Sequence, residues 1–355
     1  MSRPIVTVLI DTFNHERFIE QAILSALEQD FPPSEREILV VDDGSTDGTA
    51  AVVQRFIPRI RYLGKANGGQ ASAFNAGIPE ARGEIVAFLD GDDWWEPRKL
   101  SKVAEALARD AEVGMVGHGT IQVYADGRQH FEVLRKTPRF RVNSVSGAVA
   151  FRLRKSFLGT SRLVARATLL RRILPVPASL TIEADEYLFT LAAVMADVLI
   201  LPEALTFYRI HAANLYQVTG FQEDNFRRKQ RILASLAREL SAALPRHGLS
   251  PQVVRAVTEV VSAEANQLRL TVEGGYPWET VQTEWTISRI MHEGASLAHR
   301  VFKAASLIPA FFLPPRLFYR LRRRLVVNEF YLGARRALLP FPRSEHVARY
   351  WTSGP

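Results

Sequence analysis

One short stretch of the sequence gathers side chains suited to binding a cation. The apolar run at residues 85–89 is typical of a buried parallel strand. Three carboxylates follow it: Asp90, Asp92 and Asp93. A strand cannot bury unpaired carboxylates without a large cost, so we expect a cation at its carboxyl end. Closely spaced carboxylate oxygens suit Mg²⁺ or Mn²⁺, ions that also bind diphosphates. The plainer alternative is a polar turn whose carboxylates favour the N-terminus of a helix beginning near Pro97.

Three other predicted strands are also followed by polar or glycine-rich segments. The strands lie at residues 5–10, 37–41 and 60–63, and the segments after them at 11–16, 42–49 and 64–70. The carboxyl ends of parallel strands meet at one edge of a sheet, where open α/β sheets bind their ligands. We therefore expect these segments and the carboxylates after residue 89 to line one pocket.

The order of the elements predicts an α/β fold. Apolar residues at helical spacing follow the first four strands, at residues 17–29, 50–56, 71–81 and 99–109. Alternating strands and helices with short linkers indicate a parallel, doubly wound sheet. Later strands are expected at 114–117, 120–124, 159–165, 198–201 and 204–208, with a hairpin turn at 125–128 and helices at 167–174 and 187–195. Residues 135–155 are basic and show no period.

Composition narrows the class of protein and of partner. The chain has 355 residues, more than one core usually holds, and a formal net charge of +8. This charge favours an anionic partner, and nucleic acid is disfavoured because no recognised binding module accompanies the basic residues. The absence of cysteine excludes disulfides and cysteine-based zinc sites. No apolar run is long enough to span a bilayer, and we expect no secretory signal.

Four motifs, taken together and in order, resemble those of the family 2 glycosyltransferases. They are residues 11–14 (DTFN), 41–49 (VDDGSTDGT), 67–77 (beginning NGGQ) and 89–95 (LDGDDWW). The resemblance covers roughly residues 5–214. It implies a GT-A fold, which is a Rossmann-like, mostly parallel sheet flanked by helices. It also implies transfer of a sugar from a nucleotide-sugar to a hydroxyl acceptor, with inversion and with Mg²⁺ or Mn²⁺.

The resemblance places the nucleotide at the ends of the first two strands. Asp11 and Phe13 would flank the base, and Asp42 or Asp43 would accept a hydrogen bond from the base or ribose. Phe13 stands where the family usually has tyrosine, so one hydroxyl contact would be missing. Lys65 would meet a phosphate as a point charge. The alternatives are a capped turn for the two aspartates and a solvated loop lysine.

Two further motifs would approach the diphosphate. The glycine-rich segment from Asn67 to Gln70 allows close backbone approach to a ligand, although it would also serve as a turn into a helix. Asp90-Gly91-Asp92 resembles the family's DXD motif. Asp92 would then hold the divalent ion, Asp90 would be directed to the ribose or the metal, and Asp93 would only cap the next helix.

Residues 208–214 resemble the family's YRxH stretch. By this resemblance His211 would bind the metal or the diphosphate, and Arg209 would offset phosphate charge. The alternative for His211 is a structural role. Thr160 and Ser161 are placed on the acceptor side by their position alone.

The acidic segment 183–186 resembles the family motif that carries the general base. The sequence has Ala184-Asp185-Glu186 where the family usually has a Glu-Asp pair. We favour Asp185 as the base, with Glu186 as the alternative. The simpler interpretation is that both carboxylates stabilise a helix N-terminus.

The resemblance also divides the chain. We expect a catalytic domain at residues 1–215, with a nucleotide-sugar half at about 1–110 and an acceptor half at about 111–215. A helical extension is expected at 216–303 and a basic, apolar tail at 304–355. The tail segment 308–331 interleaves arginines with large apolar residues, which is typical either of a membrane-surface anchor or of a helix packed back on the protein.

The function predicted from the sequence is therefore that of a metal-assisted glycosyltransferase. Its partners would be a nucleotide-sugar donor and a glycan or lipid-linked acceptor, in the cytoplasm or on the inner face of the cell membrane. A nucleotidyltransferase is the alternative among enzymes, but the segment after the first strand lacks the glycines it would favour. A non-catalytic nucleotide-sugar or carbohydrate-binding relative is the other alternative, and the unusual Ala184 keeps it open.

Overall fold

A computed structural model of the chain describes residues 5–211, 223–291, 297–326 and 347–352. The chain forms two compact units. Unit 1 comprises residues 1–214, 244–253 and 346–355, and unit 2 comprises residues 215–243 and 254–345. The predicted boundary at residues 215 and 216 lies outside the described residues.

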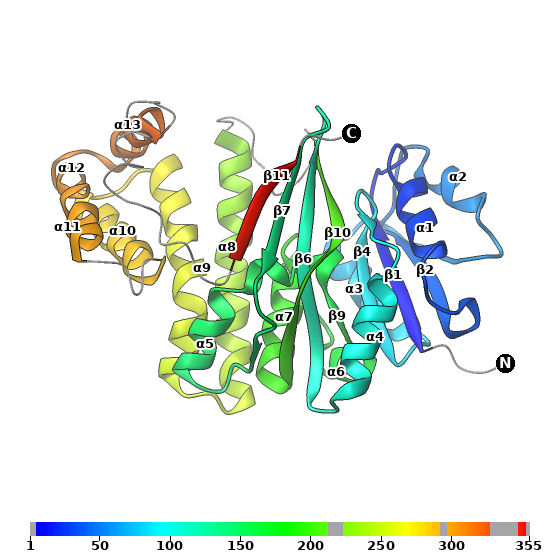
Figure 1. Ribbon diagram of the computed structural model, residues 1–355. Helices are drawn as coiled ribbons and strands as arrows, with labels where there is room; N and C mark the ends of the chain where they lie inside the picture. The colour runs from blue at the N-terminus through cyan, green and yellow to red at the C-terminus, as the bar shows by residue number, and fades with distance from the viewer. Residues whose placement is uncertain (1–4, 212–222, 292–296, 327–346, 353–355) are drawn as a thin grey trace. The chain divides into compact units, whose positions relative to one another are not determined.

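Four parallel strands form the amino-terminal part of the sheet in unit 1. They are β1 (Val6–Thr12), β2 (Arg36–Asp42), β3 (Arg61–Gly64) and β4 (Ile85–Asp90). Their order is β4-β1-β2-β3, with β1 hydrogen-bonded to both β4 and β2 (Figure 1). The carboxyl ends of these strands therefore share one edge of the sheet, as the strand–helix alternation predicts.

Helices cover both faces of this parallel part. Helices α1 (Ile19–Leu27), α2 (Thr49–Gln54) and α4 (Lys99–Arg109) share one apolar core with Val8 and Ile10 of β1. Helix α3 (Gln70–Glu80) covers the other face so closely that a Cβ atom at Gly77 would lie 2.8 Å from side-chain atoms of Leu9 and Val41. Burial on both faces explains why these strands are continuous apolar runs.

The second half of unit 1 is mainly antiparallel. It contains β5 (Trp94–Trp95), β6 (Val113–Tyr124), β7 (Gln129–Leu134), β8 (Arg139–Phe140), β9 (Val164–Arg166), β10 (Asp197–Ile210) and β11 (Val347–Thr352). Its helices are α5 (Val145–Arg152), α6 (Ala167–Ile173) and α7 (Ala184–Met195). Strand β9 pairs antiparallel with both β4 and β6 and so joins the two halves. Strand β10 runs parallel to β6.

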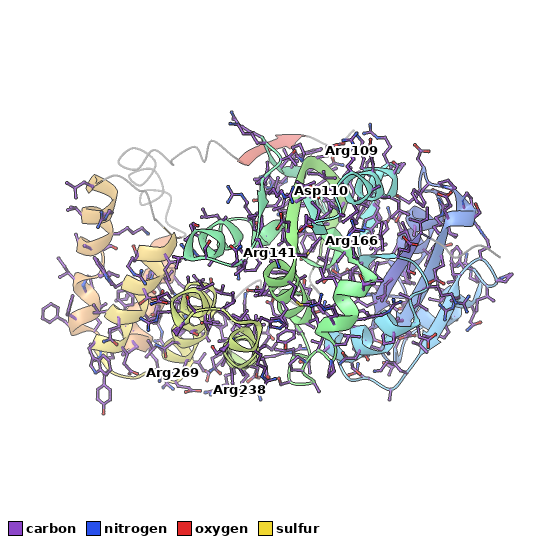
Figure 2. The ribbon with its side chains drawn as sticks, turned by 90° about the horizontal axis from the view of Figure 1, so that it is seen from below. Arg109, Asp110, Arg141, Arg166, Arg238 and Arg269 are labelled. Atoms are coloured by element: carbon purple, nitrogen blue, oxygen red, sulfur yellow. The ribbon has the colours of Figure 1, made fainter. Side chains whose placement is uncertain are left out.

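Arg166 fixes β9 to the end of α4. Its guanidinium group donates hydrogen bonds to the carbonyl oxygens of Leu107 at 2.7 Å, Val113 at 2.9 Å and Asp110 at 3.2 Å. Figure 2 labels Arg166 and Asp110. The turn that precedes β9 is thereby held against β4, and this turn carries Thr160 and Ser161.

The predicted α/β fold with a helical C-terminal region is confirmed, and the sheet is mixed. Two predicted strand pairs are single long strands, β6 and β10. In β10 the register to β6 shifts near Pro202, because proline cannot donate a ladder hydrogen bond. The predicted strand at 159–165 starts late, because Thr160–Arg162 forms a 3₁₀ turn. The segment 135–155, which shows no period, contains β8 and α5.

Unit 2 is helical in its described residues. Its helices are α8 (Glu223–Ala243), α9 (Pro251–Val272), of which the first three residues belong to unit 1, α10 (Pro277–Met291), α11 (Leu297–Ala305), α12 (Ile308–Phe312) and α13 (Pro315–Val326). Leu270, Ala310, Phe318 and Tyr319 form a small core that joins α9, α12 and α13. Among the described residues, no helix has the length and apolar character needed to cross a membrane.

Candidate active site at the carboxyl edge of the sheet

The ends of β1 and β4 bring two predicted site residues together. Asp11 and Asp90 are paired positions on these neighbouring strands. Burial raises the pKa of both carboxyl groups well above the usual value, and the charge of Asp185 raises the pKa of Asp11 further. The Asp11 Oδ1 atom is buried and has no hydrogen-bond partner within the described part of the chain.

Asp92 lies between two histidines. Its Oδ2 atom is 3.0 Å from His211 Nε2 and 3.8 Å from His15 Nε2. Burial opposes ionisation of Asp92, but the hydrogen bond to His211 and the charge of His15 outweigh it and lower the pKa of Asp92. Gly91 is required beside this cluster, because a Cβ atom there would lie 2.6 Å from Thr12 Oγ1 and 2.7 Å from His15 Nδ1.

Asp93 does not cap the next helix, contrary to the prediction. It is buried, and its Oδ1 atom accepts a hydrogen bond from the Arg209 backbone N–H at 3.0 Å. The prediction is wrong because Asp93 directly precedes β5, which pairs with β10 and directs the carboxylate inward. Burial, reinforced by the charge of Asp92, raises the pKa of Asp93 to about 8.

The donor set fits a divalent cation. The charges of Asp11, Asp92 and Asp93 raise the pKa of Asp90, and the charge of Asp92 also raises the pKa values of Asp11 and Asp93. Carboxylate oxygens and an imidazole nitrogen are suitable ligands for Mn²⁺, and carboxylate oxygens for Mg²⁺. Within the described ranges, no three such side chains already converge as a ligand set.

Arg209 borders the same cluster. Its Nε atom donates to the Asp92 carbonyl oxygen at 3.0 Å, and its guanidinium carbon lies 4.5 Å from the Trp94 ring centre and 4.9 Å from that of Phe18. Trp94 also stacks on Phe207. These contacts hold a cation beside the backbone of the DXD-like segment. Residues 212–214, the end of the YRxH-like stretch, lie outside the described residues.

The two aspartates at the end of β2 hold the neighbouring loops. Asp42 accepts hydrogen bonds from the Ser45 N–H at 2.8 Å and the Tyr62 hydroxyl at 2.9 Å. Asp43 forms an ion pair with Lys65 at 2.5 Å and accepts hydrogen bonds from the N–H groups of two loop glycines, at 3.1 Å and 2.6 Å. Each carboxylate thus has a structural task in holding a loop.

The remaining predicted donor residues lie around this loop. Phe13 is 41% exposed after β1. Asn67 lies against Gly44, whose φ of +79° requires glycine, since a Cβ atom there would come 2.6 Å from the Asn67 nitrogen. Gln70 bridges to the opposite half: its Nε2 atom donates to Thr160 Oγ1 and its Oε1 atom accepts from the Ala184 N–H, both at 3.0 Å.

The two candidate bases have different surroundings. Asp185 Oδ2 accepts hydrogen bonds from Thr160 N–H at 2.9 Å and Thr160 Oγ1 at 3.0 Å, and burial raises the pKa of Asp185. Glu186 is paired with Lys155, with 2.6 Å between Nζ and Oε1. Glu183, the residue before α7, has a φ of +63°, a conformation that is uncommon outside glycine. It turns the chain into α7.

A family sequence model matches the part of the chain that contains these strand ends. The sequence model of the family described as "Glycosyl transferase family 2" matches residues 7–161. This segment belongs to glycosyl transferase family 2. The matched segment includes every donor-side carboxylate described above.

Curated relatives match between about a third and three fifths of this chain. An uncharacterized glycosyltransferase of Nostoc sp. is 35% identical over 59% of this chain and 66% of the relative. The putative teichuronic acid biosynthesis glycosyltransferase TuaG of Bacillus subtilis is 38% identical over 30% of this chain and 42% of its own length. Chondroitin synthase of Pasteurella multocida is 33% identical over 35% of this chain and 13% of its own length. The chain thus spans less than two thirds of each of these relatives.

Two solved structures share the fold of this glycosyltransferase. TarS residues 1–349 from S. aureus, in complex with UDP-GlcNAc, aligns with a TM-score of 0.53 at 18% identity, over 86% of this chain and 91% of that one. The mannosyltransferase PcManGT from Pyrobaculum calidifontis, in complex with GDP-Man and Mn²⁺, aligns with a TM-score of 0.51 at 21% identity, over 95% of this chain and 88% of that one.

Sequence reasoning missed two residues at the candidate site. His15 follows the first strand by three residues, and its approach to Asp92 joins two strand ends that local spacing alone does not connect. Lys99 lies at the start of an amphipathic helix, where a lysine usually faces solvent, yet it is fully buried behind the site.

Proposed function

We propose that this glycosyltransferase transfers a hexosyl group from a nucleoside-diphosphate sugar to a hydroxyl group of a glycan acceptor, with inversion and with Asp185 as general base. The observation that carries the proposal is the arrangement of carboxylates on one sheet edge. Asp11, Asp90 and Asp92 lie at strand ends, and Asp185 is close enough for its charge to raise the pKa values of Asp11 and Asp90. The complexes of TarS with UDP-GlcNAc and of PcManGT with GDP-Man support a nucleotide-sugar donor.

The proposed reaction is a direct displacement. The acceptor hydroxyl oxygen bonds to the anomeric carbon as the bond from that carbon to the diphosphate oxygen breaks. Asp185, ionised and held by Thr160, takes the hydroxyl proton on the face opposite the leaving group. Arg209 contributes positive charge beside the departing nucleoside diphosphate. Glu186 is disfavoured as the base because Lys155 already occupies its carboxylate.

Asp92, with Asp90 and His211, would hold a Mg²⁺ or Mn²⁺ ion. When bound, such an ion polarises the phosphates and stabilises the charge on the leaving group. The proposal is supported by the unpaired buried carboxylate oxygens at this edge and by the Mn²⁺ named for PcManGT. In the same proposal Asp42, Asp43 and Lys65 shape the nucleotide pocket, and Asp11 and Phe13 border the base.

The acceptor is proposed to be a growing glycan. The curated relatives include a putative teichuronic acid biosynthesis glycosyltransferase, a chondroitin synthase and a hyaluronan synthase, whose products are polysaccharides. A lipid-linked glycan is the second form of acceptor that we propose, because unit 2 carries a surface suited to a membrane.

That surface, called here the basic–apolar surface, lies on α11, α12 and α13. Residues 297–326 contain seven basic side chains and no acidic ones: Arg300, Lys303, Arg316, Arg320, Arg322, Arg323 and Arg324. Exposed large apolar side chains accompany them, with exposed fractions from 40% to 78%: Leu297, Val301, Ile308, Phe311, Phe312, Leu317 and Leu321. Apolar side chains among cations match the interface of an anionic bilayer.

Helix α13 has features of both interpretations of the tail, a helix packed on the protein and a membrane-surface anchor. Phe318 and Tyr319 share a small core with Leu270 of α9, so one face of α13 is packed inside unit 2. Leu317 and Leu321 remain exposed on its other face. We therefore propose peripheral attachment of the enzyme to an anionic membrane surface. Residues 327–331, as well as Arg335 and Arg336, lie outside the described residues.

The donor site is tested by calorimetry with a panel of nucleoside diphosphates, with and without Mn²⁺. Wild-type protein should bind at least one of them more tightly with Mn²⁺. Asp92→Ala should weaken that binding at least about tenfold. Asp126→Ala, an exposed turn carboxylate outside the site, should bind like wild type. Absence of binding to every nucleotide would overturn the proposed donor site.

The reaction is tested by NMR of the product formed from the bound donor and oligosaccharide acceptors. An inverted anomeric configuration is expected, and retention would exclude the direct displacement. Donor binding without either transfer or donor hydrolysis would favour the non-catalytic binding protein. Membrane attachment is tested separately by co-sedimentation with anionic vesicles of phosphatidylglycerol and phosphatidylcholine and with vesicles of pure phosphatidylcholine. Binding only to the anionic vesicles is expected, with loss in Phe311→Ser/Phe312→Ser, and binding to neither would reject it.

A further inference from the structure

Three hydrogen-bond donors converge on one backbone carbonyl oxygen behind the site. The Ser161 oxygen accepts from Lys99 Nζ at 2.6 Å, Thr206 Oγ1 at 2.6 Å and Trp95 Nε1 at 3.1 Å. The donors come from α4, β10 and β5, three elements that are distant from Ser161 in sequence. A carbonyl oxygen has two lone pairs, whereas this one accepts three hydrogen bonds.

The hydrogen bond from Lys99 to this carbonyl group requires the burial of an amine, which costs free energy. Its side chain is fully buried, with Nζ 3.7 Å from the centre of the Trp95 ring, and burial lowers its pKa well below the usual value. The charges of Asp93 and Asp90 oppose this lowering of the pKa, but the hydrogen bond that Nζ donates goes to the Ser161 carbonyl oxygen. A buried amine that serves only stability would be replaceable by an apolar side chain of similar volume. The hydrogen bond that buried Lys99 donates therefore indicates a role for this side chain other than filling the core.

The anchored peptide connects the two chemical halves of the site. On one side, the Asp90 N–H donates to Ser161 Oγ at 3.0 Å, and that hydroxyl donates to Asp90 Oδ2 at 3.2 Å. On the other side, the N–H and the hydroxyl of Thr160 both donate to Asp185 Oδ2. Two consecutive residues thus bind the donor-side carboxylate and the proposed base.

We infer that Lys99 is a positioning residue, which fixes the distance between Asp90 and Asp185 by anchoring the Ser161 carbonyl group and, through it, the turn that carries Thr160 and Ser161. This inference rests on the proposed function of these two carboxylates. Lys99 itself contacts neither carboxylate through any hydrogen bond found in the described residues. Its effect should therefore fall on the alignment of the base with the bound donor, and much less on donor binding.

The direct test is Lys99→Met, which keeps an unbranched side chain, one atom shorter, and removes the donor. We expect kcat to fall by about 10- to 100-fold, because a displacement of the base by as little as about 1 Å can cost this much. Donor Kd should change by less than about threefold. The acidic limb of the kcat/KM pH profile should move to higher pH, since a loosened Thr160 no longer stabilises ionised Asp185. A purely structural role would change thermal stability without moving kcat or the pH profile.

Two further variants define the outcome. Lys102→Met is the matched control on the same helix, where the lysine forms a half-exposed ion pair with Glu203 at 3.4 Å, and it should behave like wild type. Thr206→Val removes a second donor from the same carbonyl and should lower kcat in the same direction, which keeps the inference testable if Lys99→Met does not fold. Wild-type kcat and pH profile in both anchor variants would overturn the inference. Absence of turnover in wild type would instead reject the proposed function.

Discussion

Asp11 and Asp90 face each other across the ladder between β1 and β4, with both pKa values raised by burial and by neighbouring carboxylates. Such a pair destabilises the metal-free protein, because each charge is desolvated and repels the other. The site therefore trades stability of the free protein for affinity toward a cationic or cation-bearing ligand.

Asp11→Asn should stabilise the metal-free protein. The substitution removes a buried charge that has no hydrogen-bond partner at Oδ1 among the described residues, and we expect a gain of about 1–3 kcal/mol in the free energy of unfolding. Because the folded pKa of Asp11 is raised, its protonation contributes its full stabilisation below the unfolded value of about 3.9, and this stabilisation is lost as pH rises through the folded pKa. The difference in Tm should thus be larger at neutral pH than in mild acid. Thermal denaturation under both conditions measures it, and a variant less stable than wild type at neutral pH would contradict the argument.

Asp185→Asn and Glu186→Gln should separate the two candidate bases. Loss of a general base costs about 10²- to 10⁴-fold in rate, so Asp185→Asn should lower kcat in that range while donor Kd stays near wild type. Glu186→Gln loses only its pairing with Lys155 and should lower kcat by less than about tenfold. Steady-state kinetics and calorimetry check both, and the reverse order of effects would assign the base to Glu186.

Thr160→Val should shift the pH dependence of the reaction. Asp185 must be ionised to accept a proton, so kcat/KM rises with pH through its pKa, which burial places above the ordinary value. The Thr160 hydroxyl donates to the ionised carboxylate and lowers that pKa. Its removal should move the acidic limb upward by up to about one pH unit. Thr258→Val, on α9 in unit 2, offers a control whose profile should match wild type. A limb that stays in place would show that Asp185 does not set it.

Asp43→Ala should unfold the loop that leads into α3. The carboxylate satisfies two glycine N–H groups and the Lys65 ammonium, and leaving these donors unpaired should cost at least about 2 kcal/mol. Asp47→Ala, in the half-buried turn of the same motif, removes hydrogen bonds from Thr49 and Glu16 but no ion pair, and it should cost less. Urea denaturation provides both values. Equal stability of the two variants would show that Asp43 has no such structural task.

Much of the fold could be predicted because its signals are local. The apolar runs of β1, β2 and β4 are buried on both faces, so each run stands out and leads into aspartate. Parallel strands with intervening helices have few possible arrangements, so the amino-acid pattern alone predicts Asp11 and Asp90 on one edge of the sheet. The α/β class and the helical C-terminal region follow from the same periodicity.

What could not be predicted depends on contacts between distant residues. The 3₁₀ turn at Thr160–Arg162 has the composition of a strand, and only its hydrogen bonds to Asp90 and Asp185 explain why it turns. Lys99 fits the polar face of an amphipathic pattern, and its burial arises from β5 and β10 closing over it. Asp93 has the local sequence of a helix cap, and only the pairing of β5 with β10 places it inside.

In the hydrogen-bonded ladder, Asp11 of β1 pairs with Asp90 at the end of β4, whereas Asp42 at the end of β2 pairs with Thr12. Neighbouring strands lie about 4.8 Å apart, and a slip of one residue would turn every side chain to the opposite face. The spacing of these carboxylates is thus set by backbone geometry and cannot adjust gradually. If the site selects ligands by the distance between their charged groups, the spacing of the sheet sets that selection. Directed evolution confined to the loops would change the acceptor more readily than the length of the donor diphosphate.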